Sequence, residues 1–228
     1  MKHIAIVGGS KGIGFEITKA FVDRHKVYNM SRSMPNFEHE NLTHYTCDVT
    51  QNTLPVLDQV DTLIYCPGSI NLKPITRLDI EDFKADLEIN LFGAIKAIKT
   101  YLPQLKKSEL NASILLFSSV ATKLGMPFHA SISAAKSAVE GLVKSLAAEL
   151  APNIRINAIA PTITNTNLAN KLLRNEQIQT KTKERHPLKN YLDPEEVATL
   201  ATYLTSDEAK AFSGQIFNMD YGIVSLKL

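Results

Sequence analysis

Residues 4–14 read IAIVGGSKGIG, and this stretch decides the fold. The apolar run 4–7 predicts a β-strand, and apolar residues spaced three and four apart predict an amphipathic helix over 13–23. Between them, Gly8, Gly12 and Gly14 form the pattern G-x-x-x-G-x-G. Glycines allow a tight turn and close backbone approach to a pyrophosphate, which then lies at the positive end of the helix. The stretch therefore predicts a dinucleotide-binding turn between a strand and a helix.

Short apolar runs alternate with helical patterns along the rest of the chain. The expected strands are 4–7, 27–30, 42–47, 61–66, 113–117, 154–160 and 216–219, and the expected helices are 13–23, 54–60, 80–102, 130–150 and 194–205. Asp79 and Asp193 are the expected N-caps of two helices. This alternation predicts βαβ units. We expect a single doubly wound Rossmann-like α/β domain over 1–228, with a mostly parallel seven-stranded sheet flanked by helices on both faces.

Composition narrows the possible partners. Of the 228 residues, 44% are apolar, which excludes intrinsic disorder, and the net charge of +2 gives no reason to expect nucleic acid or a membrane surface. No stretch approaches the length of a membrane span, and the apolar run at 4–7 is too short for a signal peptide. Cys47 and Cys66 lack zinc-site spacing, so we expect no metal and two free thiols in a cytoplasmic protein.

The end of the second expected strand indicates which nicotinamide cofactor binds. Residues 29–33 read NMSRS, without the acidic residue that would bind the ribose 2′-hydroxyl of NAD. Arg32 can instead hold a 2′-phosphate bidentately, Ser31 can donate to it, and Lys11 can approach it. This pattern favours NADP(H) over NAD(H). The alternative is that Arg32 stacks on the adenine or is only solvated.

Further motifs follow the glycine turn in an order that resembles the short-chain dehydrogenase/reductase family over essentially the whole chain. Asp48, Asn90, Ser119 and Thr166 stand where the family has its adenine contact, catalytic asparagine, catalytic serine and carboxamide contact. The sequence departs from the family's motifs at three places. Val7 replaces a threonine, Tyr65–Pro67 replace the first three residues of N-N-A-G, and Thr162 replaces a glycine. The resemblance and the glycine turn together imply this set of cofactor contacts: Gly8, Ser10, Lys11, Gly12, Ile13, Gly14, Ser31, Arg32, Asp48, Val49, Gly68, Asn90, Lys136, Pro161, Ile163 and Thr166.

The family's signature Y-x-x-x-K is broken. Counting thirteen residues from Ser119 reaches position 132, which is isoleucine, whereas Lys136 stands at the lysine position. No tyrosine lies between Tyr101 and Tyr191, so a shifted register does not restore it. In the family, the tyrosine exchanges the carbonyl proton, the lysine holds the nicotinamide ribose and lowers the phenol pKa, the serine binds the substrate oxygen, and the asparagine supports a water-linked proton path.

A substitute for the tyrosine is therefore needed if the protein is an enzyme. His129 lies three residues before Ile132 and seven before Lys136, which places all three on one helix face. We therefore expect catalytic roles for Ser119, Lys136, Asn90 and His129, with ordered water as the other source of the proton. The alternative for His129 is that it caps the helix or packs under the loop.

Three functions remain open from the sequence. The first is an NADP(H)-dependent oxidoreductase that reduces a carbonyl or oxidises an alcohol on a small molecule. The second is an NADP(H)-binding protein without reductase activity, a sensor or partner subunit. The third is a related enzyme acting on an activated imine or olefin. Residues 165–186 are the expected substrate loop or lid. The resemblance implies a homotetramer or homodimer, and the small apolar residues around helix 134–150 are a candidate interface.

Overall fold

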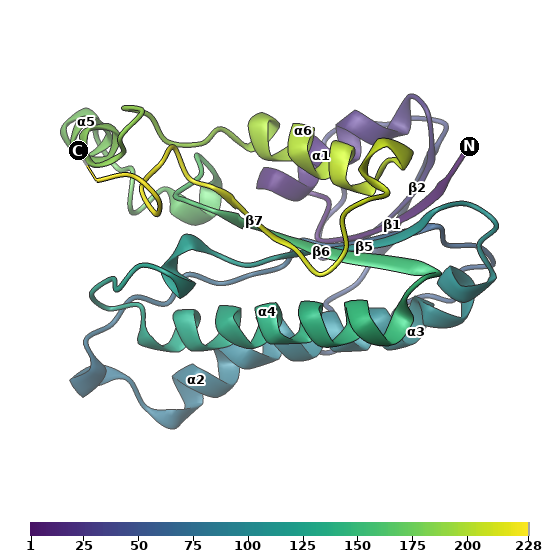
Figure 1. Ribbon diagram of the computed structural model, residues 1–228, viewed down its shortest axis with the longest axis horizontal. Coiled ribbons are helices and arrows are strands. Elements are labelled where there is room, and N and C mark those ends of the chain that lie inside the picture. Colours follow the sequence, from purple (N-terminus) through teal and green to yellow (C-terminus); the bar gives the residue numbers. More distant parts are fainter. Residues whose placement is uncertain (228) are drawn as a thin grey trace.

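The computed structural model describes residues 1–227 as a parallel sheet between two layers of helices (Figure 1). All strand pairs are parallel, and the strand order is β3-β2-β1-β4-β5-β6-β7. The expected doubly wound architecture is confirmed. The strands are β1 (His3–Val7), β2 (Lys26–Ser31), β3 (Leu42–Thr46), β4 (Thr62–Tyr65), β5 (Ala112–Phe117), β6 (Ile154–Pro161) and β7 (Ile216–Met219).

Helices cover both faces of the sheet. On one face lie α1 (Gly12–Val22) and α6 (Pro194–Thr205), which pack against each other, and on the other lie α2 (Ile80–Leu87), α3 (Gly93–Lys107) and α4 (Ala130–Leu150). Each face has its own buried apolar cluster. Every residue of β5 is buried. Double coverage explains why this strand is an almost continuous apolar run in the sequence.

Two of the expected helices differ from the structure. The helix expected over 54–60 is wrong: this segment is irregular, and the carbonyls of Pro55 and Leu57 accept hydrogen bonds from Tyr101 and Gln104 of α3 instead of from helical N–H groups. The helix expected over 80–102 is divided into α2, a π-helical turn at Glu88–Phe92 and α3, which continues to Lys107. The expected caps are confirmed, since Asp79 and Asp193 each form a reciprocal capping box with the residue three positions later.

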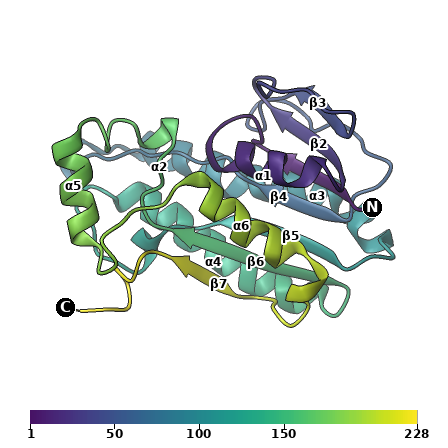
Figure 2. The same cartoon turned by 90° about the horizontal axis from the view of Figure 1, so that it is seen from above.

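The carboxyl ends of the parallel strands lie along one edge of the sheet, where binding sites of such folds form. Figure 2 shows α5 (Glu176–Arg185) at this edge, beyond the ends of β6 and β7. The expected substrate loop, residues 165–186, contains α5 and the short 3₁₀ turn Asn167–Ala169. Within residues 1–227, no helix has the length and apolar character needed to cross a membrane.

Candidate active site

The glycine turn connects β1 to α1 as a narrow backbone cradle. Gly8 has φ +83°, a left-handed conformation that favours glycine, and a methyl group on Gly14 would collide with the Gly8 carbonyl oxygen. The Gly9 N–H donates to Asn29 Oδ1 at 2.9 Å, and Thr18 Oγ1 donates to the Gly14 carbonyl at 2.8 Å. Because side chains are excluded and the helix N-terminus opens onto this space, the turn fits a pyrophosphate.

The ends of β2 and β3 flank this cradle. Lys11 and Arg32 are exposed, and Ser10 Oγ lies 3.3 Å from Ser33 Oγ. Ser31, in contrast, is buried, and its hydroxyl lies 3.0 Å from Asn29 Oδ1 and 3.1 Å from the Ser33 carbonyl. The structure thus places two exposed cations, Lys11 and Arg32, beside the cradle, while the Ser31 hydroxyl is already engaged inside the protein.

Asp48 follows β3 and is held by its own turn. Its Oδ1 accepts hydrogen bonds from Thr50 Oγ1 at 2.7 Å and from the Thr50 N–H at 3.0 Å. These bonds lower the pKa of the Asp48 carboxyl, with a smaller contribution from Arg32. The neighbouring Val49 is buried. Asp48 is therefore a fixed anionic acceptor beside the cradle.

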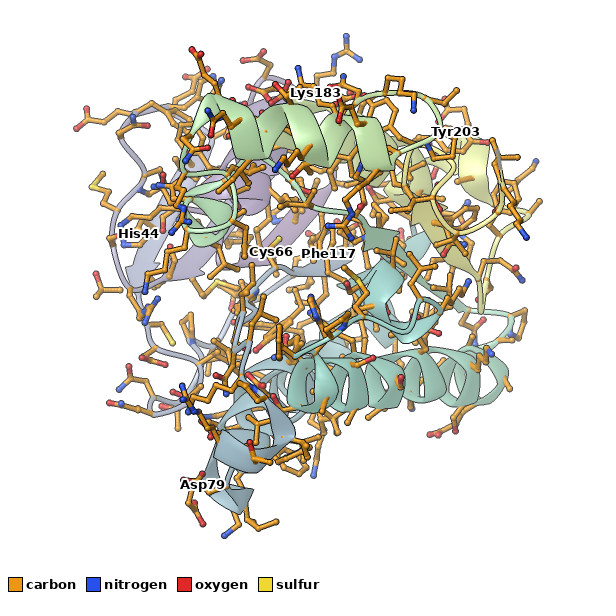
Figure 3. All side chains as sticks on the ribbon, turned by 90° about the vertical axis from the view of Figure 1, so that its left-hand side faces the viewer. His44, Cys66, Asp79, Phe117, Lys183 and Tyr203 are labelled. Carbon is orange, nitrogen blue, oxygen red and sulfur yellow. The ribbon has the colours of Figure 1, made fainter. Side chains whose placement is uncertain are left out.

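A cavity of about 370 Å³ opens at the carboxyl edge of the sheet. Figure 3 looks onto this edge: Cys66 and Phe117 lie at its centre, between α4 and the helix α5 that carries Lys183. Burial raises the pKa of the Cys66 thiol to about 12, so this sulfur is not a thiolate near neutral pH. Eight of the eighteen predicted site residues line the cavity: Ile13, Gly68, Ser119, His129, Lys136, Pro161, Ile163 and Thr166.

Lys136 and Asn90 converge beside Gly68. Lys136 is buried on α4, and its Nζ donates to the Phe117 carbonyl at 2.9 Å. Burial lowers the pKa of Lys136 to about 8, against the opposing effects of Cys66 and Asp86. A methyl group on Gly68 would lie 3.2 Å from Asn90 Oδ1 and 3.5 Å from Lys136 Nζ. Both polar groups thus reach the same narrow space.

The π-helical turn between α2 and α3 positions Asn90. Asn90 Nδ2 donates to Ser69 Oγ at 2.9 Å and to the Asp86 carbonyl at 2.8 Å. Tyr65 packs against this turn, and its hydroxyl donates to the Ile89 carbonyl at 2.6 Å. Tyr65 stands where the resemblance places asparagine, so this chain braces the turn with a phenol.

Ser119 caps a short 3₁₀ turn at the cavity wall, where its Oγ accepts from the Ala121 N–H at 3.2 Å. Helix α4 anchors this turn and the residue before it by hydrogen bonds to one carboxylate. Glu140 Oε1 accepts from Ser118 Oγ at 2.6 Å and from Thr122 Oγ1 at 2.7 Å. Sequence reasoning missed Glu140, although its position one helical turn after Lys136 places it on the same face.

His129 and Ile132 share the cavity-facing side of α4 with Lys136, as the spacing predicts. His129 occupies the N-cap position, but its side chain makes no capping hydrogen bond. Its Nδ1 lies 2.7 Å from the Pro127 carbonyl, which can only accept, so Nδ1 carries a proton and Nε2 is the other available nitrogen. Ile132 is 6% exposed and presents only carbon to the cavity.

Comparison with known proteins agrees with this arrangement. The family model "Enoyl-(Acyl carrier protein) reductase" matches residues 37–224. A 3-oxoacyl-[acyl-carrier-protein] reductase, FabG of Thermotoga maritima, is 33% identical over 178 residues, which cover 78% of this chain and 71% of that protein. The chain belongs to the short-chain dehydrogenase/reductase family. A second relative, carbonyl reductase [NADPH] 2 of Sus scrofa, is 25% identical, covering 96% of this chain and 95% of that protein.

Solved structures with the same fold agree with this assignment. A family member from Francisella tularensis has a TM-score of 0.91 at 28% identity, covering 99% of this chain and 100% of that chain. ElxO with NADP bound has a TM-score of 0.89 at 26% identity, with the same coverage. The relatives' names describe oxidoreductases acting on carbonyl or alcohol groups, and some bind a nicotinamide cofactor. The prediction of a short-chain dehydrogenase/reductase-type oxidoreductase is confirmed at this level.

Proposed function

We propose that this protein is an NADP(H)-dependent oxidoreductase that reduces a carbonyl or oxidises an alcohol on a small molecule. The observation that carries the proposal is that Ser119 and Lys136 line one cavity, with Asn90 reaching Lys136 beside Gly68 at its wall. A protein that only binds a nucleotide has no need of a serine hydroxyl in that wall. The names of the carbonyl reductase and 3-oxoacyl reductase relatives support the same reaction class.

The preference for NADP(H) rests on the end of β2. Arg32 is an exposed cation there, Lys11 in the glycine turn is another, and no acidic residue stands at the end of that strand. A guanidinium matches a 2′-phosphate in charge and geometry. The bound nicotinamide cofactor would supply or accept the hydride. The cradle would hold its pyrophosphate, Asp48 and Val49 its adenine, and Lys136, Ile163 and Thr166 its nicotinamide end.

Side chains of this protein bind the substrate, hold the cofactor and move the proton. Ser119 holds the substrate oxygen by a hydrogen bond, and Lys136 holds the nicotinamide ribose while its charge favours negative charge nearby. Asn90 supports a water-linked proton path. Ile132 cannot exchange a proton, so another group must do so, and the sequence offers His129 or a bound water for this role.

We propose that residues 165–186 contact the substrate and act as a lid within the single domain 1–228. Leu168 and Ile178 contribute apolar wall to the cavity, whose lining is mostly apolar. A small molecule with an apolar body suits such a wall. We further propose that the protein assembles as a homodimer or homotetramer through its long helices.

The second candidate function is NADP(H) binding without turnover, and Ile132 is the observation that favours it. Titration of the purified protein with NADPH and NADH, followed by a carbonyl panel, separates the two. Binding of NADPH in preference to NADH with turnover is the expected result. Tight NADPH binding without turnover would favour the second candidate, and failure to bind either nucleotide would refute both.

The role of His129 is tested by a pH–rate profile. If His129 donates the proton, the pH dependence of the parent's rate should change in His129→Ala. His129→Gln is the matched variant, because it keeps hydrogen bonding but not acid–base chemistry. A profile that is the same in all three proteins would assign the proton to another group.

A further inference from the structure

A buried carboxylate beside the cavity has no assigned role. Asp86 lies on α2, is 2% exposed, and is absent from the resemblance to the family. Its Oδ1 accepts from Ser69 Oγ at 2.5 Å, and Ser69 lines the cavity. Its Oδ2 is buried with no hydrogen-bond partner among residues 1–227. A carboxylate in such a place is costly unless another group compensates it.

The groups around Asp86 belong to the site already described. Ser69 Oγ accepts from Asn90 Nδ2 at 2.9 Å while it donates to Asp86. Asn90 Oδ1 is a second buried acceptor without a partner in the described chain. Lys136 on α4 is close enough for Asp86 to raise its pKa, and the exposed Lys73, paired with Asp82, lies farther out. The carboxylate, the hydroxyl and the amide therefore form one connected network facing the cavity.

We propose that Ser69 and Asp86 form an acid–base pair of this active site, in which Ser69 contacts the substrate oxygen or a water bound to it. The inference rests on the proposed function and identifies the source of the proton. A serine is a poor acid or base alone, but a carboxylate within hydrogen-bond distance of its hydroxyl allows it to relay a proton. The half-buried Ser69 is the only member of the pair that touches the cavity.

The proton balance is simple in either direction. In alcohol oxidation, the substrate carbon gives its hydride to the nicotinamide cofactor, and the substrate O–H bond breaks. That proton passes to Ser69 Oγ as the proton of Ser69 passes to Asp86 Oδ1. The products are a carbonyl and a protonated Asp86, which then releases the proton to solvent through bound water. In carbonyl reduction, each transfer runs in reverse.

The hydrogen bonds as they stand match the base form of the pair. Ser69 donates to Asp86, so the hydroxyl oxygen has electron density available toward the cavity, where it can accept the alcohol proton. The unpartnered Asp86 Oδ2 and Asn90 Oδ1 are acceptors that a bound water can satisfy. Both requirements of a proton relay, a contact at the substrate and a proton store behind it, are met in one network.

Kinetics of Asp86→Asn and Ser69→Ala test the pair. Each substitution should lower kcat by about 100-fold or more, the usual contribution of a positioned acid or base, while NADPH affinity is retained. The double variant should be no slower than the slower single variant, because the two groups act as one unit. Glu81→Gln, which removes an exposed carboxylate from the same helix, is the matched control and should leave kcat unchanged.

A second measurement does not depend on turnover. In protein labelled with ¹³C at the aspartate carboxyls, the Asp86 resonance is identified by its loss in Asp86→Asn, and its titration should shift in Ser69→Ala and on addition of a non-reacting alcohol. If Asp86→Asn folds poorly, the kinetics of Ser69→Ala carry the test, because that variant removes the hydroxyl that faces the cavity and leaves the carboxylate in place. A titration that neither perturbation moves would overturn the proposal.

The outcomes separate the pair from the proposed function. Failure of the parent protein to bind NADPH refutes the proposed function itself. Turnover by the parent that Asp86→Asn does not slow, or that only His129→Ala abolishes, refutes the pair alone. NADPH binding without turnover of any carbonyl or alcohol also refutes the pair, since it then performs no chemistry.

Discussion

Restoring the phenol at position 132 is the most direct test of how this site works. Ile132 is 6% exposed and faces a cavity of about 370 Å³, so the extra atoms of tyrosine have space to enter. Lys136 lies one helical turn further along the same face. Its ammonium group should lower the pKa of the new phenol, as a neighbouring positive charge favours the ionised form. Ile132→Tyr should therefore acquire an acid–base group without losing the existing ones.

The size of the effect follows from the value of a positioned acid or base. Such a group contributes about 10²- to 10⁴-fold in rate, which corresponds to about 2.7–5.4 kcal/mol of activation free energy. Because the parent site already has a proton path in our proposal, the increase in rate for Ile132→Tyr should lie near the lower end of this range, about 10²-fold. In an Asp86→Asn background, where that path is cut, the gain should be larger.

Ile132→Phe is the matched control, because it adds the ring without the hydroxyl. NADPH-dependent reduction of a carbonyl panel would be followed for the parent and both variants, with nucleotide affinity and Tm measured alongside. Overpacking by the ring costs about 1–3 kcal/mol of stability where no space exists, and it should affect both variants alike. Equal rates for tyrosine and phenylalanine, with NADPH binding intact, would refute the reasoning.

Three further predictions concern the cofactor, the buried lysine and the π-helical turn. Arg32→Ala should raise the Kd for NADPH by about 10- to 100-fold and leave that for NADH unchanged, with Lys19→Ala as the control in the same titration. Since the pKa of Lys136 is lowered to about 8 from 10.5, the unfolded chain binds more protons between these values, so stability in urea should rise with pH there by an increment missing in Lys136→Met. Gly93→Ala should destabilise the protein by about 1–3 kcal/mol in urea unfolding, because the Tyr65 hydroxyl occupies the place of the added methyl, and Tyr65→Phe should reduce that cost.

The architecture was predictable because its signals are local and repeated. The apolar runs of the strands and the caps at Asp79 and Asp193 lie in short sequence windows, and the glycine turn fixes the first βαβ unit. Where prediction failed, the segment has partners far away in the sequence. Side chains of α3 bind the carbonyls of Pro55 and Leu57, and the Tyr65 hydroxyl binds the Ile89 carbonyl within the π-helical turn at Glu88–Phe92.

Several predicted site residues lie together in the structure where a motif fixes their spacing. Ser119, His129 and Lys136 meet at one cavity because their spacing places them on one helix and the strand end beside it. Ser31 differs, because its hydroxyl faces Asn29 inside the protein, and no periodicity predicts which way a serine at a strand end will turn. Glu140 was missed because its partners lie on another element.

Asp86 shows why the rest of such a site escapes sequence reasoning. An aspartate in a short helix that carries three other charged residues resembles a solvated residue, and its spacing of four from Asn90 is common on helix surfaces. Only the packing of α2 against α4 buries the carboxylate and places it behind Ser69. The sequence shows directly that position 132 has no tyrosine. The groups that could replace its function come from three elements, which meet only after folding. A missing catalytic residue is therefore weak evidence for lost activity until the buried polar groups of the same cavity have been accounted for.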